Sequence, residues 1–340
     1  MSRPVISILN SSTFGKHFDE HIATLEEFAD LQHITVPADI DADALAEKIK
    51  NSDGIIASVT PKIPRRTLEQ CEKLVLLVRH GIGCDNVDLE AATELGIMVS
   101  RVKGIVEKEA VAEYAVSLLM AASRKVTQGS EAVKNSAWAT RAGMIGMELK
   151  GKTIGIIGLG NIGSRSSEIL SKGFGANIIA SDPYIAKERF AQFGATEVPL
   201  DELIRRSNAI LFHCPLTDET KRMLGAEQFA SMQKGVVLVN TCRGELVDED
   251  ALVNALQNGQ LHAYATDVVE GEPIDGNHRL TKLDNVLITP HLGGYSWESL
   301  HGMGQTCVDD SVEVFKNNGV PGELANPEVL KKTRRVWQSH

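Results

Sequence analysis

The sequence predicts an α/β fold made of two doubly wound domains, each built on a parallel sheet. Short apolar runs rich in β-branched residues alternate with longer helical patterns along the chain, which is typical of parallel strands joined by helices. The strand candidates are apolar almost throughout, as strands buried on both faces are. A chain of 340 residues is also too long for one small core, so two domains are expected.

Five strand candidates occupy the first hundred residues. Helical patterns at 41–50 and 87–95 lie between them, so this part of the chain is expected to form one compact α/β unit. The strand candidates are VISIL (5–9), HITV (33–36), GIIAS (54–58), LVLLV (74–78) and GIMVS (96–100).

An unusually apolar helix is expected next, at 107–126. Ala112, Ala115, Leu119 and Ala122 keep helical spacing, and other apolar residues fill a second face. A helix that is apolar on nearly every side is buried, here between domains or between subunits.

Six further strand candidates follow the helix, and six strands with intervening helices is the count of a doubly wound domain. A last helix is expected at 297–318. The strand candidates are TIGIIG (153–158), NIIAS (177–181), AILFH (209–213), VVLVN (236–240), AYATDV (263–268) and NVLIT (285–289).

The composition excludes several classes of function. Hydrophobic residues make up 43% and charged residues 24% of the chain, which is ordinary for a soluble globular protein. The net charge of -10 argues against a nucleic-acid partner, because such a surface needs a basic patch. The apolar run in the N-terminal MSRPVISILN is too short for a signal peptide, and no run reaches the about 18 apolar residues of a membrane span, so neither is expected.

The five cysteines are scattered, odd in number and without a C-x-x-C pair. This pattern favours reduced thiols over a disulfide framework or a zinc site. We therefore expect a cytoplasmic protein that holds no metal.

The segment GLGNIG (158–163) fits the pattern G-x-G-x-x-G directly after a strand candidate and opens a helical run. In this context Gly158 permits a tight turn, Gly160 lets backbone amides reach a pyrophosphate, and Gly163 lets helix and strand pack closely. The segment predicts a dinucleotide site, although the loop alone also suits a Rossmann-type methyltransferase.

Asp182 ends the next strand candidate, about 20 residues further on, where a carboxylate accepts hydrogen bonds from a ribose 2′-hydroxyl. The competing interpretation is a surface aspartate that starts a turn before Pro183. Because a carboxylate repels a 2′-phosphate and no arginine follows immediately, NAD is favoured over NADP as the cofactor.

Polar side chains follow three more strand candidates. Arg243 comes after 236–240, Asp267 and Glu272 after the next strand, and His291 after the last. Open α/β sheets bind ligands beyond the carboxyl ends of their strands, so these side chains are expected to meet at the cofactor.

These residue types suit hydride transfer to a 2-keto acid. Arg243 can bind a carboxylate in bidentate fashion, and His291 can give a proton to the developing alkoxide. Glu272, if paired with His291, would stabilise the imidazolium. Singly, each has a plainer interpretation as a surface arginine, a helix-capping glutamate or a backbone-bonded histidine.

The chain resembles the D-isomer-specific 2-hydroxyacid dehydrogenase family, and within it the phosphoglycerate dehydrogenases, over about residues 50–318. The resemblance implies that Arg243, Glu272 and His291 are catalytic. The matching stretches are VRHGIGCDNVDLEAA (78–92), LKGKTIGIIGLGNIG (149–163), HCPLTDET (213–220), LVNTCRGELVDEDAL (238–252), DVVEGEP (267–273) and TPHLGG (289–294).

The resemblance also implies a Rossmann NAD-binding domain, 105–296, inserted in a flavodoxin-like substrate domain made of 1–104 and 297–340. The helix at 107–126 would then connect the domains and contribute to a homodimer. Besides the three glycines of the loop, the implied cofactor contacts are Asn161, Ile162, Asp182, His213, Cys214, Pro215, Thr241, Cys242, Asp267, Gly293 and Gly294.

Two departures from the family bear on the substrate. Ala57 stands where relatives that use phosphoglycerate carry an arginine, and Lys103 replaces a proline, with Arg101 nearby. We therefore expect activity on acids of glyoxylate or hydroxypyruvate size, with or without an anionic tail, and poorer activity on 3-phosphoglycerate. The expected substrate contacts are Ser58, Arg79, Gly81, Ile82 and Lys103.

Two classes of function remain open from the sequence. The first is an NAD-dependent dehydrogenase of small 2-hydroxy acids. The second is an NAD(H)-sensing binding protein, because YSWES (295–299) is similar to a branch that includes the C-terminal-binding-protein corepressors. Formate dehydrogenases pair their histidine with glutamine, so Glu272 argues against that relative.

Overall fold

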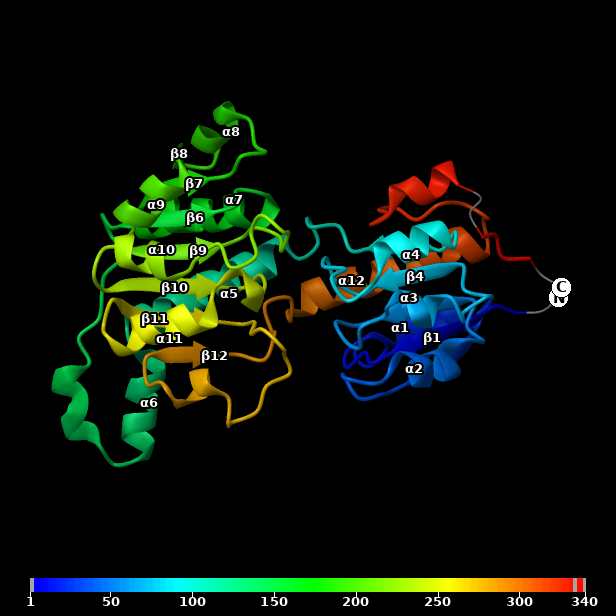
Figure 1. Ribbon diagram of the computed structural model, residues 1–340, viewed down its shortest axis with the longest axis horizontal. Helices are drawn as coiled ribbons and strands as arrows, with labels where there is room; N and C mark the ends of the chain where they lie inside the picture. Colours follow the sequence, from blue (N-terminus) through cyan, green and yellow to red (C-terminus); the bar gives the residue numbers. More distant parts are fainter. Residues whose placement is uncertain (1–2, 333–334, 339–340) are drawn as a thin grey trace. The chain divides into compact units, whose positions relative to one another are not determined.

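The computed structural model describes residues 3–332 and 335–338. The chain divides into two compact units, the first made of Met1–Glu107 with Tyr295–His340 and the second of Lys108–Gly294 (Figure 1). Each unit contains one sheet, and every pairing between the named strands is parallel. The predicted fold class, two parallel-sheet α/β domains, is confirmed.

The first unit has a five-stranded sheet in the order β2-β1-β3-β4-β5. Its strands are β1 (Val5–Leu9), β2 (Asp30–Ile34), β3 (Gly54–Ala57), β4 (Leu76–Arg79) and β5 (Met98–Arg101). Its helices are α1 (Asp19–Glu26), α2 (Ala42–Ile49), α3 (Arg65–Leu68), α4 (Leu89–Glu94), α12 (Trp297–Phe315) and the short 3₁₀ helix η5 (Pro327–Lys331).

Two cores lie on the two faces of this sheet. Helices α2, α3 and α4 supply one core, in which Leu45 and Leu68 pack on Ile55. Helices α1 and α12 supply the other, in which Leu25 and Val308 pack with Ile56. The alternation follows from the pleat, because neighbouring residues of a strand point to opposite faces.

The strand predicted at 33–36 differs most from the structure. β2 runs over Asp30–Ile34, at the edge of the sheet, and its side chains are mostly exposed or half-buried. An edge strand with exposed side chains lacks a continuous apolar run. The prediction from apolar residues therefore began at residue 33, three residues after the strand starts.

The second unit has a seven-stranded sheet in the order β12-β11-β10-β9-β6-β7-β8. This is one strand more than predicted, because β8 is short and its last two residues are exposed. The strands are β6 (Thr153–Ile157), β7 (Asn177–Ser181), β8 (Ala195–Glu197), β9 (Ala209–Phe212), β10 (Val236–Asn240), β11 (Leu261–Thr266) and β12 (Val286–Ile288).

Helices cover both faces of the second sheet as well. Residues of α5, such as Leu119, lie in one core and residues of α9 and α10, such as Leu203 and Phe229, in the other. The helix expected at 107–126 ends at Ser123, and a left-handed residue, Lys125, precedes α6. The helices are α5 (Lys108–Ser123), α6 (Val126–Lys134), α7 (Asn161–Glu168), α8 (Lys187–Gln192), α9 (Leu200–Arg206), α10 (Ala226–Ser231) and α11 (Glu249–Gln257), with short helical turns η1 (Trp138–Gly143), η2 (Ile169–Gly173), η3 (Gly244–Leu246) and η4 (Arg279–Lys282).

The strand order reverses between β6 and β9, which follow one another in the sheet but not in the chain. Because all strands are parallel, the segments after β6, β9, β10, β11 and β12 leave the sheet at one edge. Ligands of open α/β sheets bind at this edge, next to the reversal. No helix within the described residues combines the length and apolar character that crossing a membrane requires.

Candidate active site

The glycine loop follows β6 and begins α7. Gly158 has φ +89°, and a Cβ atom there would lie 2.6 Å from the carbonyl oxygen of His213. A Cβ atom on Gly163 would lie 2.0 Å from the carbonyl oxygen of Gly158. At Gly160, by contrast, nothing lies within 4 Å of the Cβ position. The outer glycines are therefore required for packing, and the middle one leaves open space at the amino end of α7.

The carboxylate of Asp182, just after β7, is bound to this loop. Its Oδ2 accepts a hydrogen bond from the backbone N–H of Leu159 at 2.8 Å, and its Oδ1 accepts one from Tyr184 N–H at 2.9 Å. Each oxygen keeps a further lone pair for a ligand hydroxyl. The open glycine position and the fixed carboxylate fit the pyrophosphate and ribose of a dinucleotide.

His213, Cys214 and Pro215 follow β9 beside the glycine loop. Both ring nitrogens of His213 are buried and have no hydrogen-bond partner among the described residues. Burial lowers the pKa of His213 to about 3 and raises the pKa of Cys214 to about 11. Both side chains are therefore uncharged near pH 7, and the backbone of His213 and Cys214 packs against Gly158.

Asn240, the last residue of β10, shapes the loop that carries Arg243. Its Nδ2 donates to the carbonyl oxygen of Arg243 at 2.8 Å, and its Oδ1 accepts from Cys242 N–H at 2.9 Å. Asn240 is fully buried, and Nδ2 also donates to the hydroxyl of Tyr264 at 3.3 Å. Sequence reasoning missed this residue. The available signal was an asparagine that ends an otherwise apolar strand, because a buried amide needs partners.

The rest of that loop is tightly packed. Nη1 of Arg243 donates to the carbonyl oxygen of Cys242 at 2.6 Å, and burial raises the pKa of Cys242. Thr241 and Cys242 are half-buried at the sheet edge. A Cβ atom on Gly244 would lie 2.1 Å from the backbone nitrogen of Glu270, so the Arg243 loop contacts the segment that carries Glu272.

Asp267, after β11, holds the turn after β12. One carboxylate oxygen accepts from Thr289 Oγ1 at 2.6 Å and Leu292 N–H at 2.8 Å, and the other accepts from Gly293 N–H at 2.7 Å. Its backbone carbonyl accepts from the N–H of His291 at 2.9 Å. Burial raises the pKa of Asp267, while these hydrogen bonds oppose the rise. The structure thus gives Asp267 a supporting contact with the turn that carries His291, Gly293 and the following glycine, Gly294.

His291 and Glu272 form a hydrogen-bonded pair. Nδ1 of His291 lies 2.5 Å from Oε1 of Glu272, and Oε2 of Glu272 accepts from Val269 N–H at 3.2 Å. His291 has φ +57°, a left-handed conformation that is uncommon outside glycine and clusters at functional sites. With Nδ1 bound to Glu272, Nε2 is the nitrogen left for a reactant.

The substrate contacts expected in the first unit lie at the carboxyl edge of its sheet. Ser58 follows β3, Gly81 and Ile82 follow β4, and Lys103 follows β5, and these three strands are neighbours. Arg79, at the end of β4, is buried, and its Nη1 donates to the carbonyl oxygens of Ala57 and His80.

The two cations after β5 differ in their surroundings. Lys103 is exposed, whereas Nε of Arg101 donates to Oε1 of Glu323 at 3.0 Å. The charge of Arg101 is therefore already paired, and Lys103 is the better candidate for contact with an anion.

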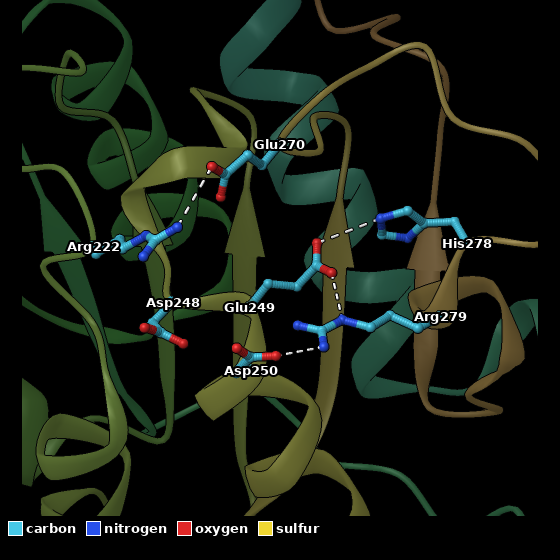
Figure 2. A pocket seen from close by; sticks show the side chains of 7 residues that line it. All are labelled: Arg222, Asp248, Glu249, Asp250, Glu270, His278 and Arg279. Carbon is cyan, nitrogen blue, oxygen red and sulfur yellow. Dashed lines mark hydrogen bonds and ion pairs between the residues drawn. The ribbon is translucent and has the colours of Figure 1, made fainter.

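A charged cavity of about 230 Å³ lies in the second unit (Figure 2). Glu249 contacts Arg279 at 2.6 Å and His278 at 3.6 Å, and Arg222 contacts Glu270 at 3.7 Å. The lining is completed by Asp248, which caps α11, and by Asp250, which pairs with Arg279. These charges largely pair with one another, so the lining of the cavity is an ion-pair network.

Comparisons with known proteins identify the family of the chain. The sequence model of "D-isomer specific 2-hydroxyacid dehydrogenase, NAD binding domain" matches residues 116–293. D-3-phosphoglycerate dehydrogenase of Methanocaldococcus jannaschii is 39% identical over 90% of this chain, which spans only 56% of that relative. Glyoxylate reductase of Aeropyrum pernix is 36% identical over 92% of this chain and 95% of the relative. The crystal structure of D-lactate dehydrogenase from Aquifex aeolicus, complexed with NAD and lactic acid, is 26% identical over 94% of this chain and 99% of that chain, with a TM-score of 0.82.

The parallel sheet, the glycine loop after β6 and the His291–Glu272 pair fit a dehydrogenase that uses a nicotinamide cofactor. The chain belongs to the D-isomer specific 2-hydroxyacid dehydrogenase family, whose cofactor is NAD and whose reactants are small 2-hydroxy and 2-keto acids. The named relatives are enzymes, which supports catalysis over the NAD(H)-sensing alternative.

Proposed function

We propose that this protein reduces a small 2-keto acid with NADH, and that His291 is the proton donor. The observation that carries the proposal is the 2.5 Å contact between His291 Nδ1 and Glu272 Oε1. A carboxylate at Nδ1 fixes the orientation of the ring and leaves Nε2 for a reactant.

Bound NADH would supply the hydride that reduces the carbonyl carbon. Nε2 of His291 gives its proton to the carbonyl oxygen as negative charge develops there. Glu272 stabilises the imidazolium before this transfer. Arg243 binds the substrate carboxylate through its planar guanidinium, which fixes the carbonyl next to His291.

The residues proposed to hold NAD are those around the loop after β6. Gly160, Asn161 and Ile162 bind the pyrophosphate at the amino end of α7, supported by Gly158 and Gly163. Asp182 accepts hydrogen bonds from the ribose hydroxyls. The remaining proposed contacts, with the adenine and nicotinamide ends, are His213, Cys214, Pro215, Thr241, Cys242, Asp267, Gly293 and Gly294.

The substrate is proposed to be glyoxylate, hydroxypyruvate or an acid of similar size. The Aeropyrum pernix relative, which matches nearly end to end, is a glyoxylate reductase. Ala57 is buried and offers no cation at its position. Ser58, the backbone amides of Gly81 and Ile82, and Lys103 are proposed to contact the substrate. Arg79, which binds two neighbouring carbonyl oxygens, is proposed to act by holding that turn as well as by its charge.

Steady-state NADH oxidation with glyoxylate, hydroxypyruvate and 3-phosphohydroxypyruvate tests this choice. We expect higher kcat/KM with the two smaller acids, and Lys103→Ala is expected to lower kcat/KM for hydroxypyruvate. The matched control is Lys150→Ala, an exposed lysine of the second unit before β6. A kcat/KM for 3-phosphohydroxypyruvate ten times that of hydroxypyruvate, unchanged in Lys103→Ala, would contradict the substrate proposal but not the dehydrogenase reaction.

The protein is further proposed to form a homodimer and to be located in the cytoplasm. The arm formed by α6 and η1 stands away from the sheet of the second unit (Figure 1) and has no buried residue. On this arm, Trp138 is 64% exposed and Val126 and Val133 are also exposed, and Ile145, just after η1, is 78% exposed. Exposed apolar side chains gathered on one arm support an interface with a second copy of the chain. The cytoplasmic assignment rests on the five cysteines, all of them free thiols.

Sedimentation equilibrium tests the dimer. The wild type is expected to sediment with twice the mass of one chain, and Trp138→Ser is expected to shift the equilibrium toward monomer. Trp297→Ser, which alters an equally exposed tryptophan of the first unit, is the control and should leave the mass unchanged. A monomeric wild type would contradict this part of the proposal.

A further inference from the structure

Three potential metal ligands lie together in the first unit, outside the candidate active site. Glu20 and His21 belong to the first turn of α1, and His301 belongs to α12. One ligand atom from each residue lies within 4.8 Å of the others. Nε2 of His301 is 3.6 Å from Oε1 of Glu20.

His21 is buried between the two helices and cannot move freely. The residue is 2% exposed, and its ring stacks on Phe14 with centroids 6.0 Å apart. The ring of His301 lies 5.2 Å away. A Cβ atom on Gly304 of α12 would lie 2.4 Å from Nδ1 of His21, so a glycine at this position of α12 makes room for the imidazole.

The buried ring has an unsatisfied nitrogen. Nε2 of His21 has no hydrogen-bond partner among the described residues, although buried polar atoms are nearly always paired. Burial lowers the pKa of His21, and the neighbouring His301 acts in the same direction, while Glu20 and Asp309 oppose them. A neutral imidazole has a lone pair to give to a cation.

We propose that Glu20, His21 and His301 bind a divalent transition metal ion with the ligand preferences of Zn²⁺. Two imidazoles and a carboxylate are a known zinc ligand set, and the fourth position is left for water. Tetrahedral zinc with bonds of about 2.0–2.1 Å requires ligand atoms about 3.3 Å apart.

The three ligand atoms need to move only a short distance toward one another to reach this geometry. The Glu20–His301 separation is already close to it, and the other separations need to shorten by about 1.5 Å at most. Glu20 and His301 are exposed, so their side chains can rotate toward His21 without disturbing the core.

A simpler interpretation is that these side chains only pack and pair. His301 makes an edge contact with Phe18 at 5.0 Å, and its pairing with Glu20 needs no metal. That interpretation leaves the buried nitrogen of His21 unexplained. A bound metal takes one lone pair of the buried imidazole and also joins α1 to α12, which lie near opposite ends of the chain and pack together in the first unit.

Titration of the untagged, chelator-treated full chain with ZnCl₂ in a calorimeter tests the site. We expect one equivalent bound with a Kd below about 1 µM. Co²⁺ is expected to give the intense visible absorption of a tetrahedral complex, and Zn²⁺ is expected to abolish it. Zn²⁺ is also expected to raise the Tm.

Variants locate the metal. His301→Ala and Glu20→Gln change exposed side chains and are expected to weaken Zn²⁺ binding at least 100-fold and 10-fold, with loss of the Tm increase. His33→Ala, an exposed histidine of β2, is the matched control and should bind as the wild type does. His291→Gln tests whether the metal occupies the candidate active site instead. Wild-type binding weaker than about 1 mM, full affinity in His301→Ala, or loss of binding in His291→Gln alone would each overturn the proposal.

Discussion

Nδ1 of His291 lies 2.5 Å from Oε1 of Glu272, and His291 adopts a left-handed backbone conformation to reach it. The conformation is held by Asp267, whose backbone carbonyl binds the N–H of His291 and whose carboxylate binds the following turn. The His291–Glu272 pair is thus held in place by hydrogen bonds of the protein itself, without a substrate. Preorganisation of this kind reduces the cost of orienting the proton donor during the reaction.

Glu272→Gln removes the negative charge of this side chain but keeps its size and shape. The amide can still contact Nδ1 but does not stabilise the imidazolium, so kcat for keto-acid reduction is expected to fall about 10²–10³-fold. The Kd for NADH, measured by fluorescence titration, should change little. An unchanged kcat would mean that Glu272 only supports the fold.

Arg243→Lys keeps the positive charge but loses the planar pair of donors. We expect kcat/KM for keto acids to fall about 10–100-fold, with NADH affinity roughly intact. Arg205→Lys, on the exposed side of α9, is the matched control. Equal losses of cofactor binding and turnover would identify Arg243 as a structural residue.

Asp182→Ala is expected to raise the KM for NADH about 10-fold or more, because a charge-assisted hydrogen bond to the ribose is lost. The variant is also expected to show a smaller preference for NADH over NADPH, because the carboxylate no longer repels the 2′-phosphate. The carboxylate also holds the N–H groups of Leu159 and Tyr184. Asp182→Asn, which keeps one acceptor for the loop, should therefore lose less affinity than Asp182→Ala. A wild type that already prefers NADPH would contradict the assignment.

His213 gives an expected dependence of stability on pH. Its folded-state pKa of about 3 lies below the ordinary value, so its contribution to stability is present above about pH 6.5 and is lost as the pH falls toward 3. Between pH 7 and pH 5 this group should remove about 1–2 kcal/mol from the unfolding free energy.

Urea unfolding of the cofactor-free protein measures that effect. His213→Gln should lose less stability than the wild type between pH 7 and pH 5, and His33→Gln, which changes an exposed histidine, should follow the wild type. Parallel losses in all three proteins would show that His213 does not protonate on unfolding.

Much of the fold was predictable because its strands are buried. The runs TIGII and VVLVN became β6 and β10, since a central parallel strand must be apolar on both faces. β2 and β8 lie at sheet edges, where exposed faces remove that signal, and one was misplaced and the other missed.

Some features of the candidate site were also predictable from the sequence, and others were not. Residues after buried strands could be placed at one edge of the sheet, so the pattern predicted Gly158, Arg243 and His291 there, whereas His213 was expected only from the family resemblance. The hydrogen bonds of Asn240 and the supporting contacts of Asp267 could not, because they depend on how loops fold back on themselves. The Glu20–His21–His301 group was also beyond sequence reasoning, since no local pattern brings residue 301 back to residue 20.

The central claim is that His291 gives the proton in an NADH-dependent reduction of a small 2-keto acid. Its most direct test is single-turnover oxidation of bound NADH by glyoxylate or hydroxypyruvate, in the wild type and in His291→Gln. We expect the wild type to oxidise NADH and the variant to bind NADH normally but react about 10²–10⁴-fold more slowly. A near-normal rate in His291→Gln would contradict the account.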